Sequence, residues 1–138
     1  MTTPRAIDEI LSSRVFAVVG ASRRTDKYGS IVLADLWGKG YTAYPVNPHA
    51  SEIMGRPAFP TIASLPPGVE TLVLVVPPAQ SERAVRDAAA AGIRRIWMQP
   101  GAESASAVEF CEEHGMACVS GVCLMMRAPE AGRGPKEA

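Results

Sequence analysis

One stretch near the N-terminus combines a buried strand, a sharp turn and a group of cations, in the order that a phosphate site requires. The apolar run Val15–Val19 ends at Gly20-Ala21-Ser22, and Arg23, Arg24 and Lys27 follow. A glycine lets the backbone turn sharply and lets an anion approach it. The amides that open the next helix can face that anion, and the cations add full charges. We therefore predict a phosphate-binding turn; the alternative is a plain strand-to-helix turn with solvated cations.

The dinucleotide fingerprint G-x-G-x-x-G is absent from this turn. Ser22 and Thr25 stand where the second and third glycines would be. The acidic residue that would hold a ribose hydroxyl about 20 residues further on is also missing, because the next strand ends Val46-Asn47-Pro48. NAD is therefore disfavoured, and a ligand with an extra phosphate is favoured. The basic residues would also suit NADP, so an NADP-binding, oxidoreductase-like protein remains an alternative.

Proline marks the ends of the apolar strands, at Pro45, Pro48, Pro77, Pro78 and Pro100. Proline ends strands because it lacks a backbone donor. Rigid, apolar strand ends could also form a ready-made groove for a long, thin, partly apolar ligand. Gln99 stands at one of these ends, where it is either a hydrogen-bonding partner for that ligand or a solvated loop residue.

Strands and helices alternate with short connections. Strands are predicted at 15–19, 41–46, 71–76, 94–98 and 116–119, with a short edge strand near 58–59. Helices are predicted at 4–11, 28–37, 79–91 and about 106–114, with one helical turn near 62–65. This alternation predicts an α/β, Rossmann-like, doubly wound and mostly parallel sheet in a single domain. The expected strand order is about 3-2-1-4-5, and the ligand crevice lies where that order reverses.

Composition sets the broad class of the chain. Its 138 residues are 47% hydrophobic, which predicts one packed domain, at 1–127, followed by a disordered tail at 128–138 that is rich in Gly and Pro. Lys and Arg total 14, as do Asp and Glu, so no general attraction to nucleic acid or membrane is expected. Residues 1–13 lack the apolar region of a signal peptide.

Candidates for catalysis and metal binding are few. Cys111, Cys118 and Cys123 form no CxxC pair, which disfavours a zinc site or a disulfide and indicates free thiols in a reducing cytoplasm. His49 and His114 have no evident catalytic partner, and no serine lies in a G-x-S-x-G context. We predict no catalytic residue and no metal ligand.

Several segments together resemble the stand-alone CoA-binding domain proteins. They are GAS at 20–22, YPVNP at 44–48, GRPAFPTIASLP at 55–66, VVPP at 75–78 and WMQPGAES at 97–104. The resemblance spans roughly residues 5–127. The same fold is similar to the CoA-binding domain of the succinyl-CoA synthetase α subunit.

The resemblance implies coenzyme A as the ligand. It implies that Gly20-Ala21-Ser22 approach the phosphates and that Pro45, Val46, Asn47 and Pro48 border the nucleotide. Val76, Pro77 and Pro78 would pack on the adenine or the start of the pantetheine arm, with Gln99 along that arm and Gly101 just beyond. Charge adds Arg23, Arg24 and Lys27 for the 3′-phosphate or the pyrophosphate.

The chain departs from the synthetases because their second domain, with its phosphorylated histidine, has no counterpart here. The resemblance therefore implies a module that binds CoA or an acyl-CoA without catalysis of its own. Alternatives are the NADP protein and a CoA-site subunit that acts in trans with a ligase partner; a homo-oligomer also remains open. Cys123 is either a core residue or a neighbour of the CoA thiol.

Overall fold

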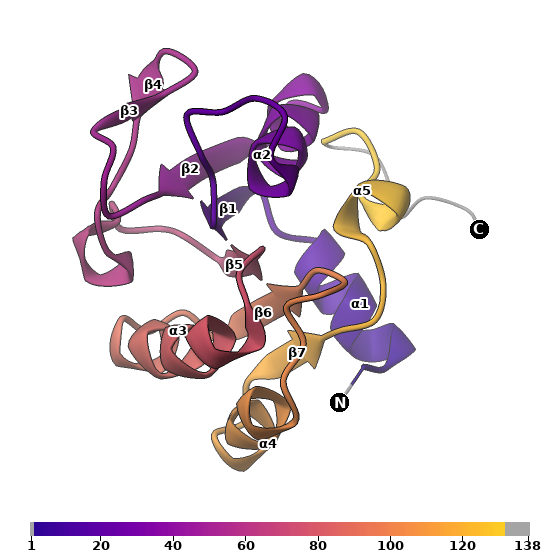
Figure 1. Cartoon of the computed structure of the whole chain (residues 1–138). Helices are drawn as coiled ribbons and strands as arrows, with labels where there is room; N and C mark the ends of the chain where they lie inside the picture. Colours follow the sequence, from indigo (N-terminus) through magenta and orange to yellow (C-terminus); the bar gives the residue numbers. More distant parts are fainter. Residues whose placement is uncertain (1, 132–138) are drawn as a thin grey trace.

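A five-stranded parallel sheet runs through the middle of the molecule, with helices on both faces (Figure 1). The computed structural model describes residues 2–131. The strand order is β2-β1-β5-β6-β7, and every neighbouring pair is parallel. The strands are β1 (Val15–Val19), β2 (Thr42–Val46), β5 (Thr71–Leu74), β6 (Arg95–Met98) and β7 (Ala117–Val119). The predicted α/β fold class is confirmed.

The predicted edge strand near 58–59 is reduced to one isolated bridge, in which Phe59 pairs parallel to Val46. With that bridge counted, the order agrees with the predicted 3-2-1-4-5, and β7 forms the opposite edge. The preceding segment holds a small hairpin that was not predicted, β3 (Glu52–Ile53) with β4 (Arg56–Pro57). The predicted helical turn is present as the 3₁₀ helix η1 (Ile62–Ser64).

The helices divide between the two faces of the sheet (Figure 1). One face carries α1 (Pro4–Leu11), α2 (Tyr28–Gly38) and the short α5 (Leu124–Arg127), which was not predicted. The other face carries α3 (Pro78–Ala90), α4 (Ala105–Glu113) and η1. Since both faces are covered, the strands are continuous apolar runs.

Side chains alternate between the two faces along each strand, which gives two separate cores. Phe16 and Trp97 pack with α1, α2 and α5. Ala17, Leu74 and Met98 pack with α3 and α4. This alternation determines whether a side chain at the end of a strand points toward α2 and α5 or toward α3.

The packed chain extends beyond the predicted domain boundary at residue 127. Ala128 and Pro129 are buried, and the Tyr41 hydroxyl donates to the Pro129 carbonyl at 2.8 Å. The Ala131 amide donates to the Lys39 carbonyl at 2.8 Å. Residues 128–131 therefore differ from the predicted disordered tail, because Ala128 and Ala131 pack with the core and the segment bonds to the chain that follows α2. The rest of that tail, 132–138, lies outside the described residues.

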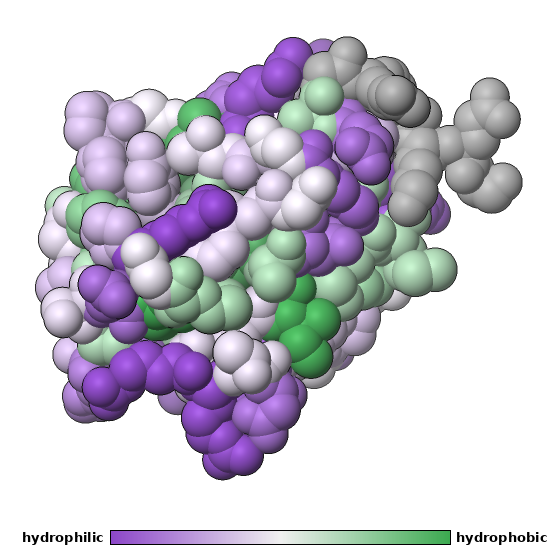
Figure 2. Space-filling model, turned by 90° about the horizontal axis from the view of Figure 1, so that it is seen from above, coloured by the Kyte–Doolittle hydropathy of each residue, from purple (hydrophilic) through white to green (hydrophobic). Residues whose placement is uncertain are grey.

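The face seen from above shows hydrophobic side chains in small patches between hydrophilic ones (Figure 2). Within residues 2–131, no helix has both the length and the apolar character that crossing a bilayer requires.

Candidate functional site

The turn after β1 is closed by two glycines. Gly20 has a φ of +106°, and a Cβ there would lie 2.1 Å from the Val75 carbonyl oxygen. Gly29 opens α2, and a Cβ there would lie 2.2 Å from the Gly20 carbonyl oxygen. The chain after β5 and the first turn of α2 therefore close on the Gly20 turn from two sides. Gly29 was not predicted; its spacing of nine residues from Gly20 matches no fingerprint.

Polar side chains hold the backbone of this turn in place. Asn47 donates through Nδ2 to the Ala21 carbonyl at 2.8 Å and accepts from the His49 amide at 2.7 Å. Ser30 donates to the Ser22 carbonyl at 2.6 Å and accepts from the Ser22 amide at 3.1 Å. The end of β2, the Gly20 turn and α2 therefore form one hydrogen-bonded unit.

A pocket of about 530 Å³ lies against this turn, at the carboxyl ends of β1, β2 and β5. We call it the Gly20 pocket. Six of the predicted site residues line it: Gly20, Ala21, Val46, Asn47, Pro48 and Val76. It opens on the α3 face of the sheet, because Val46 and Val76 pack on that side. Its volume is typical of small-molecule sites.

The remaining lining residues are Val19 of β1 and residues of two elements that the sequence analysis predicted but did not assign to the site. Pro60, Thr61 and Ile62 come from the start of η1. Four more come from one face of α3, at the helical spacing i, i+3, i+4 and i+7: Gln80, Arg83, Ala84 and Asp87. Polarity did not mark this face in the sequence, because Glu82 and Arg86 on the same helix are polar as well. Arg83 supplies a cation to the lining of this pocket.

The predicted basic group lies outside the Gly20 pocket. Arg23, Arg24 and Lys27 are exposed in the loop before α2, and none of them lines the pocket. Arg24 pairs with Asp26 at 2.8 Å, with both side chains about two-thirds exposed (67% and 65%). Such an exposed ion pair contributes little to stability. A ligand would have to reach over the turn to meet these three cations.

Other predicted residues also lie away from the pocket lining. Ser22 serves the turn, and Pro77 and Pro78 are exposed where α3 begins. Pro45 borders a separate cavity of about 250 Å³ between β2 and β4. Gly101 is exposed, and its amide donates to the Glu103 carboxylate at 2.9 Å.

Gln99 is fully buried on the opposite face of the sheet from the Gly20 pocket. It follows Trp97 by two residues, so the alternation of side chains directs it toward α2 and α5. Its Nε2 donates to the Tyr28 hydroxyl at 2.8 Å and to Cys123 Sγ at 3.4 Å. Its Oε1 accepts from the Leu124 amide at 2.6 Å. Gln99 thus ties β6 to the starts of two helices.

Cys123 is half-buried beside this glutamine. Partial burial would raise the pKa of its thiol, but hydrogen bonds from Tyr28, Gln99 and the amides of Met125 and Met126 outweigh burial, and the pKa falls below its ordinary value. Burial and the bond to Cys123 raise the pKa of Tyr28 to about 12, so the phenol stays a donor at neutral pH. The other two cysteines are buried.

Replacing Tyr28 with phenylalanine is expected to slow alkylation of Cys123 by iodoacetamide at pH 7 by about two- to fivefold, because the thiolate is the nucleophile and loses one donor. In the wild type, the rate should rise through a midpoint below that of an unperturbed thiol, about 8.5. Mass spectrometry of the labelled peptide measures the rate. The control Tyr44→Phe, remote from this network, should change nothing; an equal rate in Tyr28→Phe would contradict the assigned hydrogen bond.

Within residues 2–131, no group of three or more His, Cys, Asp or Glu side chains is arranged to hold a metal ion. The lining of the Gly20 pocket holds one cation, Arg83, and one carboxylate, Asp87, together with polar side chains such as Asn47 and Gln80. The family model for the CoA binding domain matches residues 14–129. The chain belongs to the CoA-binding domain family.

Three proteins show what this CoA-binding domain is similar to. ADP-forming acetate–CoA ligase I of Archaeoglobus fulgidus is 28% identical over 130 residues, which cover 87% of this chain and 19% of the ligase. A conserved hypothetical protein from Pyrococcus furiosus superposes with a TM-score of 0.79 and 41% identity, covering 82% of this chain and 97% of that one. Apo dinucleotide-forming acetyl-coenzyme A synthetase 1 of Ca. Korarchaeum cryptofilum superposes with a TM-score of 0.70 and 26% identity. The match covers 81% of this chain and 27% of the synthetase. The chain thus spans about one fifth of the curated ligase it matches.

Proposed function

We propose that this CoA-binding domain binds CoA or an acyl-CoA in the Gly20 pocket, without catalysis of its own. The observation that carries the proposal is the pocket itself. It lies at the carboxyl ends of a parallel sheet, against a glycine turn that a phosphate group can approach closely. Membership of the family supports CoA as the ligand class, and the pocket is the location that we propose for it in this chain.

The lining of the pocket suits the nucleotide end of CoA. Gly20 and Ala21 line the pocket, and their main chain is the proposed partner of the pyrophosphate. Ile62 and Ala84 give the base apolar walls on the η1 and α3 sides. Arg83 is exposed like Arg23 and Arg24, but it lines the pocket and they do not, so it is the cation proposed for the 3′-phosphate.

Histidine chemistry is not expected at this site. His49 is exposed in the loop after β2, and His114 stacks on Phe110 at the end of α4, with ring centroids 4.0 Å apart. Neither lines the Gly20 pocket. The proposal therefore assigns binding to this domain and no proton transfer or phosphoryl transfer.

The test is calorimetric titration with CoA and dephospho-CoA, supported by thermal unfolding. Ligand at 100 times its Kd should stabilise the fold by about 2.7 kcal/mol. Arg83→Ala should weaken CoA about tenfold and dephospho-CoA much less, because a charged hydrogen bond to the 3′-phosphate is lost. The matched control is Arg86→Ala, since Arg86 lies on the same helix but over the Phe110 ring. Stabilisation by NADP without any by CoA would overturn the proposal.

A second candidate is a CoA site that serves a ligase partner in trans. It is favoured by the relatives, in which the matched region is only a part of a longer acetate–CoA ligase. Affinity purification of the tagged chain from its own cells should then retain a ligase-like chain. Recovery of the tagged chain with no companion would count against a partner and leave CoA binding itself intact.

A further inference from the structure

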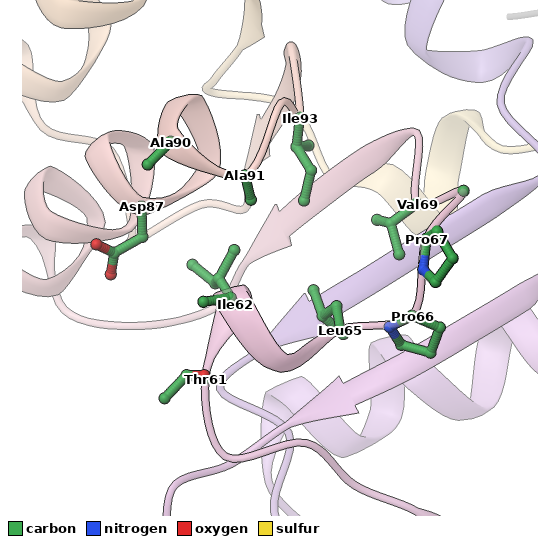
Figure 3. Close-up of a pocket in the computed structure, with 12 residues that line it drawn as sticks. Thr61, Ile62, Leu65, Pro66, Pro67, Val69, Asp87, Ala90, Ala91 and Ile93 are labelled. Atoms are coloured by element: carbon green, nitrogen blue, oxygen red, sulfur yellow. The ribbon is translucent and has the colours of Figure 1, made fainter.

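The Gly20 pocket continues into a second cavity of about 540 Å³ between η1 and α3, which we call the proline pocket. The two share Thr61, Ile62 and Asp87. Figure 3 shows Thr61 and Asp87 at one end of the proline pocket, with Pro67 and Val69 at the other. The shared residues therefore mark a junction, with the Gly20 turn on one side and an apolar chamber on the other.

Asp87 is the charged residue at this junction. Among the described residues, its carboxylate has no hydrogen-bond or ion-pair partner, although its backbone carbonyl accepts from the Ala91 amide within α3. It lies one turn beyond Arg83 on the face of α3 that lines the Gly20 pocket. Asp87 is exposed, so water can satisfy its carboxylate in the free protein. An ionised carboxylate only accepts hydrogen bonds, so a ligand group that covers Asp87 and displaces this water is favoured when it presents a donor.

The part of the ligand that presents a donor to Asp87 follows from the order of the groups along the pocket. If the phosphates bind at the Gly20 turn, a nucleotide that follows the pocket past Asn47 and Val76 would bring its base toward Ile62 and Ala84, which line the pocket on the η1 and α3 sides. The far edge of the base then faces Asp87. Adenine carries an amino donor at position 6, whereas hypoxanthine and guanine carry an oxygen acceptor there.

We propose that Asp87 accepts a hydrogen bond from the 6-amino group of adenine and so makes the site selective for adenine. This inference rests on the proposed CoA function and adds the residue that reads the base. An oxygen at position 6 would leave the carboxylate facing another acceptor, and the resulting repulsion rejects that base. The proline pocket opens directly beyond this edge, so a single substituent on the 6-amino group has room while one N–H remains for Asp87.

The test compares the affinities of three ligands by calorimetry: CoA, its hypoxanthine analogue and CoA with a benzyl group on the 6-amino nitrogen. The wild type should bind CoA about tenfold more tightly than the hypoxanthine analogue. It should bind the benzyl derivative within about threefold of CoA, because the proline pocket accepts the ring.

Asp87→Asn should bring the affinities for CoA and the hypoxanthine analogue close to equal, since an amide both donates and accepts. Asp26→Asn is the matched control, because Asp26 lies in the exposed loop before α2, and it should keep the wild-type ratio. Equal affinities in the wild type, an unchanged ratio in Asp87→Asn, or rejection of the benzyl derivative would overturn the inference while CoA binding stands. If the wild type binds none of the three ligands, the proposed function fails and this inference fails with it.

Discussion

Replacing Gly20 with alanine is expected to lower the free energy of unfolding by about 2–5 kcal/mol and to abolish measurable CoA binding. The positive φ of +106° costs an L residue about 1–2 kcal/mol. The new methyl would also stand 2.1 Å from the Val75 carbonyl oxygen, and forcing such a contact apart costs about 1–3 kcal/mol more. Both costs fall on the turn that approaches the proposed phosphate. Urea unfolding and calorimetry measure the two effects.

Gly92→Ala separates these two costs. Gly92 has a φ of +80°, but a Cβ there would meet no heavy atom within 4 Å. The variant should therefore lose only about 1 kcal/mol, from backbone strain alone, and should bind CoA as the wild type does. If Gly20→Ala were no less stable than Gly92→Ala, the close approach of β5 to the turn would not hold.

Replacing Gly29 with alanine is expected to destabilise the fold by about 2–3 kcal/mol, although it puts a better helix former into a helix. A Cβ there would lie 2.2 Å from the Gly20 carbonyl oxygen and 3.0 Å from the Ala21 amide nitrogen. Both contacts are to backbone, which cannot rotate away, so α2 has to move off the turn. We expect CoA affinity to fall about tenfold or more, because the turn then loses its shape.

The same helix supplies the control. Gly38 ends α2, and a Cβ there would meet nothing within 4 Å. Gly38→Ala should leave stability unchanged or raise it by up to about 1 kcal/mol, from helix propensity and a less flexible unfolded chain. In urea unfolding, the free energy of unfolding should fall for Gly29→Ala and stay unchanged or rise for Gly38→Ala. That difference would establish that the contact at Gly29, and not the change from glycine to alanine, causes the loss of stability. A stable Gly29→Ala with wild-type affinity would refute the tight packing.

The sheet could be predicted because its strands are continuous apolar runs that alternate with short helices, and this alternation is visible in the sequence without knowledge of long-range contacts. The Gly20 turn could be predicted for the same reason, since strand and glycine are adjacent in sequence. The hairpin at 52–57 and the single bridge at Phe59 could not, because they depend on how a proline-rich segment crosses the end of β2.

The far wall of the pocket lay beyond sequence reasoning for a different reason. Arg83 and Asp87 reach the pocket only because α3 packs against the same face of the sheet on which Val76 lies. Gln99 was predicted beside the ligand because it follows a strand; its place two residues after Trp97 directs its side chain to the face opposite the Gly20 pocket, so a role beside the ligand stays a prediction. Local charge likewise favoured Arg23 and Arg24, whereas the pocket opens on the side of α3.

The contact between Gly20 and Gly29 has a wider consequence for how such a site can diverge. At Gly20 and Gly29 main chain packs against main chain, so a side chain is disfavoured at both positions. The opposite wall includes exposed side chains on α3, such as Arg83 and Asp87, whose replacement leaves the core intact. In related chains with different ligands, we therefore expect the two glycines to persist and selectivity to be rewritten along α3.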